Sequence, residues 1–197
     1  EVMFFLPTVV SLKQLQKRIH LLCVTSGDAD GQGTVRRKEL EGVAHHLQLS
    51  SCTILDDPAF PDSMTTEWNI GALKNCLLPY LTKLNVSVVY TFDEYGVSGH
   101  CNHIALSKVA TLLSDQFCFF LLKSHSLVWK YCLVSKIYSF SSASPAFFLP
   151  LLSGIQETFQ LMGMHKSQLT WFRYLYILFS CYTNINEFSK LEAVTCK

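Results

Sequence analysis

Two histidines, His100 and His103, stand three residues apart in the most chemically informative segment of the chain, Thr91–Leu106. Gly99 comes just before the pair and a predicted helix follows, so the backbone can bend there and place both imidazoles at the helix start. Two histidines at this spacing can share a metal ion, or one can bind the metal while the other acts on a substrate. Taken alone, the pair is also compatible with a polar loop and a helix cap.

The elements that must position these imidazoles alternate between strands and helices. Short apolar runs predict buried strands at Ile19–Thr25, Cys52–Leu55 and Val86–Phe92. Helical spacing predicts helices at Val2–Gln16, Val35–Leu47, Thr65–Leu84 (capped by Thr66 and kinked or broken by Pro79) and His103–Ser114. This order predicts the α/β class, a Rossmann-like layered fold with a mainly parallel sheet flanked by helices.

The second half of the chain has weaker patterns. They predict a strand at Ser126–Ile137, a loop of small residues at Ser139–Pro145, helices at Ile155–Met164 and Ser167–Tyr182, and a loose polar tail over residues 184–197.

Open parallel sheets bind ligands in the crevice beyond the carboxyl ends of their strands. The loops at those ends are rich in Gly, Asp or His, and they are Thr25–Gly33, Asp56–Asp62 and Asp93–His103. We therefore expect the polar chemistry to gather at one edge of the sheet.

The composition limits the partners. The chain has 197 residues, 16% charged and 49% hydrophobic, with a net charge of +1, which gives no electrostatic case for nucleic acid. The apolar bias favours a large buried surface, or a face that meets lipid or another subunit. No apolar run reaches the roughly 18–20 residues of a membrane span. The aromatic run Trp171–Phe179 is predicted as core, although Arg173 and the tyrosines also suit an interfacial helix.

The eight cysteines form no C-x-x-C pair, so we interpret them as reduced thiols of a cytosol-facing protein.

The segment Thr91–Leu106, T-F-D-E-Y-G-V-S-G-H-C-N-H-I-A-L, resembles the second signature of the LmbE-like (PIG-L) deacetylases. Further similar segments follow in order along the chain, among them Ser26-Gly27, Gln32-Gly33 with Arg36, Phe60-Pro61-Asp62, and His165–Leu169 with Trp171-Phe172-Arg173. The resemblance spans most of the sequence and implies a single LmbE-like domain over residues 1–197.

The resemblance also implies roles for residues of the Thr91–Leu106 segment. His103 would be a zinc ligand, and His100 would stabilise the tetrahedral oxyanion or help to protonate the leaving amine. Asp93 could orient an imidazole through a hydrogen bond. Asn102 stands where many bacterial members have Asp and would support His103.

Substrate contacts are implied elsewhere in the chain. Arg36 matches the family's R-x-x-E-L position, which suits a substrate hydroxyl or the inositol phosphate; the alternative is an ion pair with Glu39. The family's R-D pair before F-P-D is replaced here by Pro58 and Ala59. Asp57 or Asp62 would then have to provide the missing sugar contact.

The start of the chain carries a further expectation. In the family, the first strand ends in A-H-P-D-D-E, whose His and second Asp bind zinc and whose first Asp is the general base. Glu1 resembles the last Glu of that motif, so the first strand, two ligands and the base would lie before residue 1. With His103 as the remaining ligand, we expect the chain as written to be inactive.

The function implied by the resemblance is zinc-dependent hydrolysis of the N-acetyl group of N-acetylglucosaminyl-phosphatidylinositol, a step of GPI-anchor biosynthesis. The implied partners are that glycolipid and a membrane surface, at the cytosolic face of the endoplasmic reticulum. Two alternatives stay open: a non-catalytic homologue that acts as a binding or scaffold protein, and a fragment of a gene model.

Overall fold

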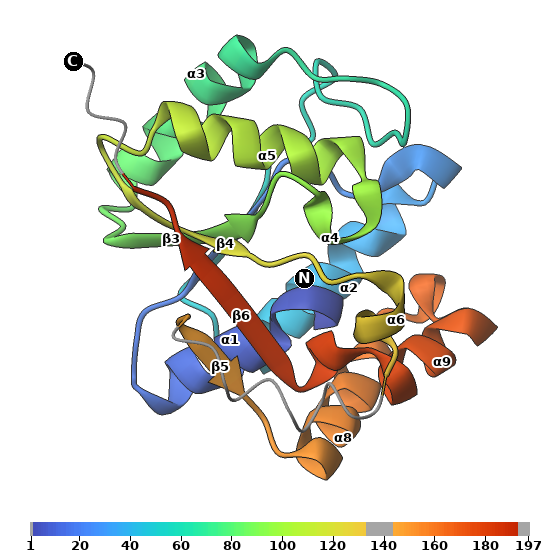
Figure 1. The fold of residues 1–197 in the computed structure, drawn as a ribbon. Helices are drawn as coiled ribbons and strands as arrows, with labels where there is room; N and C mark the ends of the chain where they lie inside the picture. Colours follow the sequence, from blue (N-terminus) through green and yellow to red (C-terminus); the bar gives the residue numbers. More distant parts are fainter. Residues whose placement is uncertain (1, 133–143, 193–197) are drawn as a thin grey trace. The chain divides into compact units, whose positions relative to one another are not determined.

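The computed structural model describes residues 2–132 and 144–192. Contacts within the chain divide it into two compact units, which are described separately (Figure 1). Unit 1 combines Glu1–Asp57 with His125–Asn186, and unit 2 combines Pro58–Ser124 with Glu187–Lys197. The prediction of one domain over residues 1–197 stays a prediction.

Unit 1 contains a parallel β-α-β arrangement near its start. Strand β1 (His20–Cys23) pairs with β2 (Ser51–Ile54), and helix α2 (Gly33–His46) connects them. Such a crossover is what two parallel neighbours require, because a short hairpin can join only antiparallel strands. The 3₁₀-helix η1 (Asp28–Asp30) lies in the loop after β1, where we expected polar chemistry.

The rest of unit 1 is mainly helical and surrounds an apolar core. Its other elements are α1 (Val2–Gln14), α6 (Leu127–Lys130), β5 (Ala146–Phe148), α8 (Leu151–Met162), η3 (Lys166–Gln168), α9 (Trp171–Phe179) and η4 (Cys181–Thr183). Leu6 of α1, Val43 of α2 and Ile177 of α9 meet in one cluster of buried side chains. Helices far apart in the sequence thus contribute to a common core.

The polar residues before and at the start of β6 (Ile185–Lys190) are buried, and their side chains are bonded to the backbone. The amide of Asn184 donates to the carbonyl oxygens of Leu149, Pro150 and Leu151 around the start of α8. Asn186 accepts from the Thr8 hydroxyl at 2.7 Å and donates to the Phe4 carbonyl at 2.6 Å. The predicted loose tail is therefore wrong for the residues of β6, because a satisfied amide can be buried without penalty; residues 193–197 lie outside the described residues.

Unit 2 holds the strand that leads to the two histidines. Strand β3 (Val88–Phe92) runs parallel to β4 (Cys118–Leu122), and the last residues of β6 pair antiparallel with β4. Helices α3 (Ile70–Lys83) and α5 (Cys101–Leu112) pack on each other, with α5 against β3 (Figure 1). The short helix α4 (Gly96–Gly99) connects β3 to α5.

Two expectations about local structure are corrected. Helix α3 begins at Ile70, with the side chain of Asn69 as its cap in place of Thr66, and Pro79 stands inside it without ending it. Residues 127–130 of the predicted strand Ser126–Ile137 form α6, because the Ser126 hydroxyl accepts from the Trp129 amide and starts a helical turn. Residues 133–137, and most of the predicted loop Ser139–Pro145, lie outside the described residues.

The α/β class is confirmed: helices alternate with strands, and two of the strand pairs are parallel. The sheets are smaller and more mixed than expected, since β6 adds an antiparallel pair. Among residues 2–132 and 144–192, no helix is long and apolar enough to cross a membrane.

Replacement by alanine should change the stability in opposite directions at two helical glycines of unit 1. A Cβ at Gly154 would lie 2.4 Å from the Asn184 amide nitrogen and 2.5 Å from the Thr183 carbonyl, whereas a Cβ at Gly42 meets only Met164, at 3.8 Å. We expect Gly154→Ala to destabilise the protein by about 1–3 kcal/mol through overpacking. Gly42→Ala should stabilise it by about 0.5–1 kcal/mol through chain entropy.

Urea unfolding midpoints of the two variants and the parent measure this difference. Equal stability of Gly154→Ala and Gly42→Ala would contradict the packing of α8 against Asn184 described above.

Candidate functional site

The loop that follows β3 is organised by one buried carboxylate. Asp93 accepts hydrogen bonds from the backbone amides of Tyr95 at 3.2 Å, Gly96 at 3.0 Å and Ser124 at 2.6 Å, and from the Ser124 hydroxyl at 2.6 Å. The same hydroxyl accepts from the Val97 amide at 2.8 Å. Asp93 therefore joins the start of α4 to the end of β4. Its expected role towards an imidazole stays a prediction, because the bonds described here go to other groups.

The loop turns through residues with left-handed backbone conformations. Gly96 has φ +58°, and a Cβ there would lie 2.9 Å from the Cβ of His103 and 3.3 Å from the Ile104 amide nitrogen. Only glycine allows both this conformation and this close approach. Val97 adopts φ 64°, which is costly for a β-branched residue and is held by the bond to Ser124.

The imidazole of His103 is fixed in one orientation. Its Nδ1 lies 3.1 Å from the carbonyl oxygen of Gly96, which can only accept, so Nδ1 carries the proton. The ring stacks on Phe92, with centroids 3.8 Å apart and planes 7° apart. In the neutral ring, Nε2 then carries the lone pair, which is the arrangement found in metal-ligating histidines whose other nitrogen donates to a carbonyl.

His100 has the opposite tautomer. It caps α5, and its Nδ1 accepts from the backbone amide of Asn102 at 3.3 Å, so the proton of the neutral ring lies on Nε2. That Nε2 lies 3.9 Å from a carboxylate oxygen of Asp62. The rings of His100 and His103 are 4.9 Å apart between centroids. The pair thus offers one protonated and one unprotonated Nε2 within one small region.

Asp62 is the site residue that was hardest to predict from the sequence. Its carboxylate accepts from the side-chain amide of Asn102 at 3.1 Å, and it lies beside His100. The loop before it is anchored where Phe60 packs on Trp68 and the Trp68 indole donates to the Pro61 carbonyl at 2.9 Å. The F-P-D resemblance was the available signal, but it suggested a sugar contact and not a partner of His100.

A complete metal site is not formed by the described residues. Within residues 2–132 and 144–192, no group of three His, Cys, Asp or Glu side chains could hold a metal ion. His103 by itself has the hydrogen bonding of a ligand. The residues present therefore fit one ligand of a zinc ion and do not fit a full coordination shell.

Arg36, in unit 1, holds the loop after β1. Its guanidinium donates to the carbonyl of Gly27 and forms a 2.8 Å ion pair with Asp30. The alternative pair with Glu39 is wrong, because the Glu39 carboxylate accepts from the backbone amide and the hydroxyl of Ser167. A substrate-binding role of Arg36 stays a prediction.

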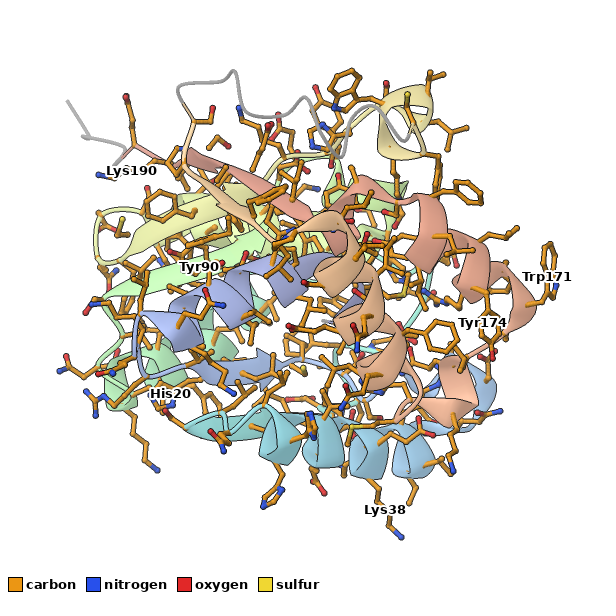
Figure 2. The ribbon with its side chains drawn as sticks, turned by 90° about the horizontal axis from the view of Figure 1, so that it is seen from below. His20, Lys38, Tyr90, Trp171, Tyr174 and Lys190 are labelled. Carbon is orange, nitrogen blue, oxygen red and sulfur yellow. The ribbon has the colours of Figure 1, made fainter. Side chains whose placement is uncertain are left out.

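The loop after β2 presents two acidic residues. Asp56 forms an ion pair with Arg37 at 2.5 Å. Burial opposes ionisation, yet hydrogen bonds from Ser26 and Arg37 outweigh it and lower the pKa of Asp56. Asp57 is exposed, and its predicted contact with substrate stays a prediction. Lys38 is exposed and points outward from α2 (Figure 2).

Unit 2 thus brings together His100, Asn102 and His103, and adds Asp62. Asp93 lies in the same loop, where it organises the backbone. Arg36 and Asp57 belong to unit 1.

Comparison with known proteins gives one family match and close sequence relatives. Residues 1–113 match the PIG-L family, described as GlcNAc-PI de-N-acetylase. The N-acetylglucosaminyl-phosphatidylinositol de-N-acetylase of Bos taurus is 37% identical over 200 residues, which cover 97% of this chain and 79% of the relative.

Solved structures share the fold at low identity. The N,N'-diacetylchitobiose deacetylase from Pyrococcus horikoshii has a TM-score of 0.65 and 16% identity, over 96% of this chain and 79% of that one. The zinc inhibited form of teicoplanin deacetylase Orf2 has a TM-score of 0.65 and 11% identity, over 99% of this chain and 95% of that one. These likenesses confirm the expected LmbE-like fold.

The hydrogen bonds of Asp93, called here the Asp93 network, make the stability of the protein sensitive to the replacement of one carboxylate oxygen. Asp93→Asn replaces an acceptor oxygen by an NH₂ group and leaves a buried donor of the Gly96 or Ser124 region without a partner. We expect a loss of about 1–3 kcal/mol in the free energy of unfolding.

The matched control is Asp115→Asn, at an exposed position just after α5. Urea unfolding, with hydrogen exchange at the Gly96 and Val97 amides, compares the variants. Unchanged stability and amide protection in Asp93→Asn would contradict the network.

Proposed function

The chain belongs to the PIG-L family of GlcNAc-PI de-N-acetylases, and we propose that it acts in the hydrolysis of the N-acetyl group of N-acetylglucosaminyl-phosphatidylinositol. The observation that carries the proposal is the pair His100 and His103, whose tautomers are opposite and fixed by backbone hydrogen bonds. Amide hydrolysis needs both an electron-pair donor that can hold a metal and a proton donor near the reacting carbonyl.

The reaction adds water across the amide. The water oxygen bonds to the carbonyl carbon, the carbon–nitrogen bond breaks, and the products are acetate and the free amino sugar, which takes up a proton. A protonated Nε2 on His100 suits stabilisation of the oxyanion that forms in between, or delivery of a proton to the leaving nitrogen.

Asp62 is proposed as a positioning residue for His100. Its carboxylate lies 3.9 Å from Nε2 and favours the tautomer with the proton on that nitrogen. Asn102 holds the carboxylate in place through its 3.1 Å bond. We accordingly propose that Asp93 acts by fixing the loop and that Asn102 acts by holding Asp62 in place, in addition to the support of the imidazoles that the resemblance implies.

Zinc is the proposed cofactor, with His103 as one ligand. A bound zinc ion would supply Lewis acidity at the carbonyl and lower the pKa of a coordinated water. Because the described residues supply no set of three ligands, we propose that residues 1–197 alone hold zinc weakly and are inactive.

For the substrate, we propose that Arg36 meets the inositol phosphate and that Asp57 meets a sugar hydroxyl. Support for Arg36 comes from its guanidinium, whose Nε is buried and has no hydrogen-bond partner among residues 2–132 and 144–192. The proposed location is the cytosolic face of the endoplasmic reticulum, in GPI-anchor biosynthesis, as the resemblance implies. No nucleic-acid partner is proposed, since the net charge is only +1.

A second candidate is a non-catalytic homologue that binds the glycolipid. Two observations favour this candidate. Pro58 and Ala59 replace the family's R-D pair. The described residues also form no complete metal site.

The two candidates are separated by the kinetics of a protein that contains residues 1–197 together with the A-H-P-D-D-E strand expected before them. The substrate is N-acetylglucosaminyl-phosphatidylinositol. We expect His100→Ala to lower the rate of acetate release by about 10²–10³-fold with little change in zinc content, because His100 acts on the reacting groups. His103→Ala should lose both zinc and activity. Asp62→Asn should lower kcat and leave KM unchanged, because it acts through His100.

The control is His45→Ala, an exposed histidine of α2. No acetate release from the parent, with retained glycolipid binding, would favour the non-catalytic homologue. Equal loss of zinc in His100→Ala and His103→Ala would contradict the division of roles.

Zinc retention by the polypeptide of residues 1–197 gives a test without turnover. After dialysis against metal-free buffer, we expect far less than one zinc per chain by elemental analysis. Stoichiometric zinc that His103→Ala removes would contradict the proposal that these residues do not complete the site.

A further inference from the structure

Helix α9 of unit 1 exposes an unusual amount of apolar surface. Its nine residues read W-F-R-Y-L-Y-I-L-F and contain no acidic side chain. Trp171 is 75% exposed, Leu175 48% and Leu178 45%, and the exposed set also includes Phe172, Tyr174 and Phe179. The prediction of this run as core is therefore wrong for most of the helix.

The exposure follows from the helical period. Trp171, Leu175 and Leu178 are spaced i, i+4 and i+7, so they share one outward stripe. Tyr176 and Ile177 form the inner side, where Ile177 joins the core of unit 1. Figure 2 shows Trp171 projecting outward from the start of the helix. The inner side of α9 thus joins the core, and the side chains of the outward stripe are exposed.

The apolar surface continues onto two neighbouring helices. Phe159 of α8 is exposed and its ring lies 5.6 Å from that of Tyr174. Tyr131, just after α6, contacts the buried ring of Tyr176 at 6.4 Å between ring centroids, so α6 lies beside the inner side of α9. Leu127 and Val128 of α6 are the most exposed apolar residues there, at 74% and 82%. We call the exposed residues of α9 and α6, with Phe159, the aromatic face.

Two cations are embedded beside the aromatic face without a carboxylate partner among the described residues. Arg173 lies over the Phe172 ring at 5.5 Å, and the Lys130 ammonium lies 5.6 Å from the ring centroids of Tyr131 and Tyr182. Burial lowers the pKa of both groups. The sequence from residue 158 to residue 186 has no Asp or Glu, and Lys166, just before α9, is exposed.

We propose that the aromatic face is a docking surface for a bilayer that contains anionic phospholipid. Resting on the proposed function, this inference names the surface from which the glycolipid would be reached. Tryptophan, tyrosine and phenylalanine with flanking lysine and arginine match the interfacial zone of a bilayer, where rings enter the acyl boundary and cations meet phosphates. Lys130 is 7% exposed, so the charge that can meet anionic headgroups is that of Arg173 and the exposed Lys166, and no carboxylate in residues 158–186 offsets it.

Docking would also bring the headgroup region to Arg36. The Glu39 carboxylate of α2 accepts hydrogen bonds from the backbone amide and the hydroxyl of Ser167, so the helix that carries Arg36 lies beside the segment that leads into α9. Burial, and to a smaller extent like-charge repulsion from Arg36, lowers the pKa of Arg173. A phosphate beside Arg173 would relieve that repulsion and lie in the field of both guanidinium groups. The aromatic face and the predicted phosphate contact Arg36 are thus adjacent within unit 1.

Vesicle binding of the 197-residue chain tests the docking surface. The probes are phosphatidylcholine vesicles with and without phosphatidylinositol, neither of which carries the amino sugar, so the result does not depend on deacetylation. We expect the parent to bind the phosphatidylinositol vesicles more tightly, with a blue shift of its tryptophan fluorescence.

Two variants separate the apolar and charged contributions. Trp171→Ser with Leu175→Ser should weaken binding to both kinds of vesicle by about ten-fold or more, because exposed apolar side chains are lost without a change in the core. Arg173→Gln should lower the ratio of affinities for vesicles with and without phosphatidylinositol by about five-fold. The control Leu112→Ser, an exposed position on α5 in unit 2, should bind like the parent.

Equal weakening by Leu112→Ser, or no preference for phosphatidylinositol in the parent, would overturn the proposal. So would failure to bind vesicles together with self-association that the Trp171 and Leu175 changes abolish, since the face would then be an interface between copies. Circular dichroism of each variant confirms that the fold is retained. Vesicle binding without deacetylase activity would leave docking in place and count against the proposed reaction alone.

Discussion

The geometry of the candidate site depends on the buried carboxylate of Asp93. It accepts bonds from Tyr95, Gly96 and Ser124 and so fixes the loop between β3 and α5. That loop presents the Gly96 carbonyl to His103 and lets α5 start at His100, whose Nδ1 caps it. A backbone held in a left-handed turn thus determines which nitrogen of each imidazole carries the proton.

Much of this site could be predicted from local sequence. The spacing of His100 and His103 and the glycine before them were sufficient to place both rings at a helix start. The strands β1, β2 and β3 followed from apolar runs that end in polar loops, although most of their side chains are only half-buried. The family resemblance then supplied roles that spacing alone left open between metal binding, catalysis and simple capping.

Features that depend on distant contacts were not predictable in the same way. Asp62 reaches His100 across 38 residues, through a loop anchored by Trp68, and no local pattern encodes that approach. Asn184 and Asn186 look like residues of a polar tail, yet they are buried because backbone carbonyls and Thr8 satisfy them. Conversely, the apolar α9 looked like core, although its own helix period leaves half of it outside.

The function proposed for this site requires that the chain fixes His100 and His103 in opposite tautomers. Long-range proton–nitrogen correlation spectra of the metal-free chain, at a pH where the imidazoles are neutral, measure this for each ring. We expect a protonated Nε2 in His100 and a protonated Nδ1 in His103, and in Asp93→Asn we expect each ring to exchange between its two tautomers. The same tautomer in both rings, or such exchange in the parent, would contradict this assignment.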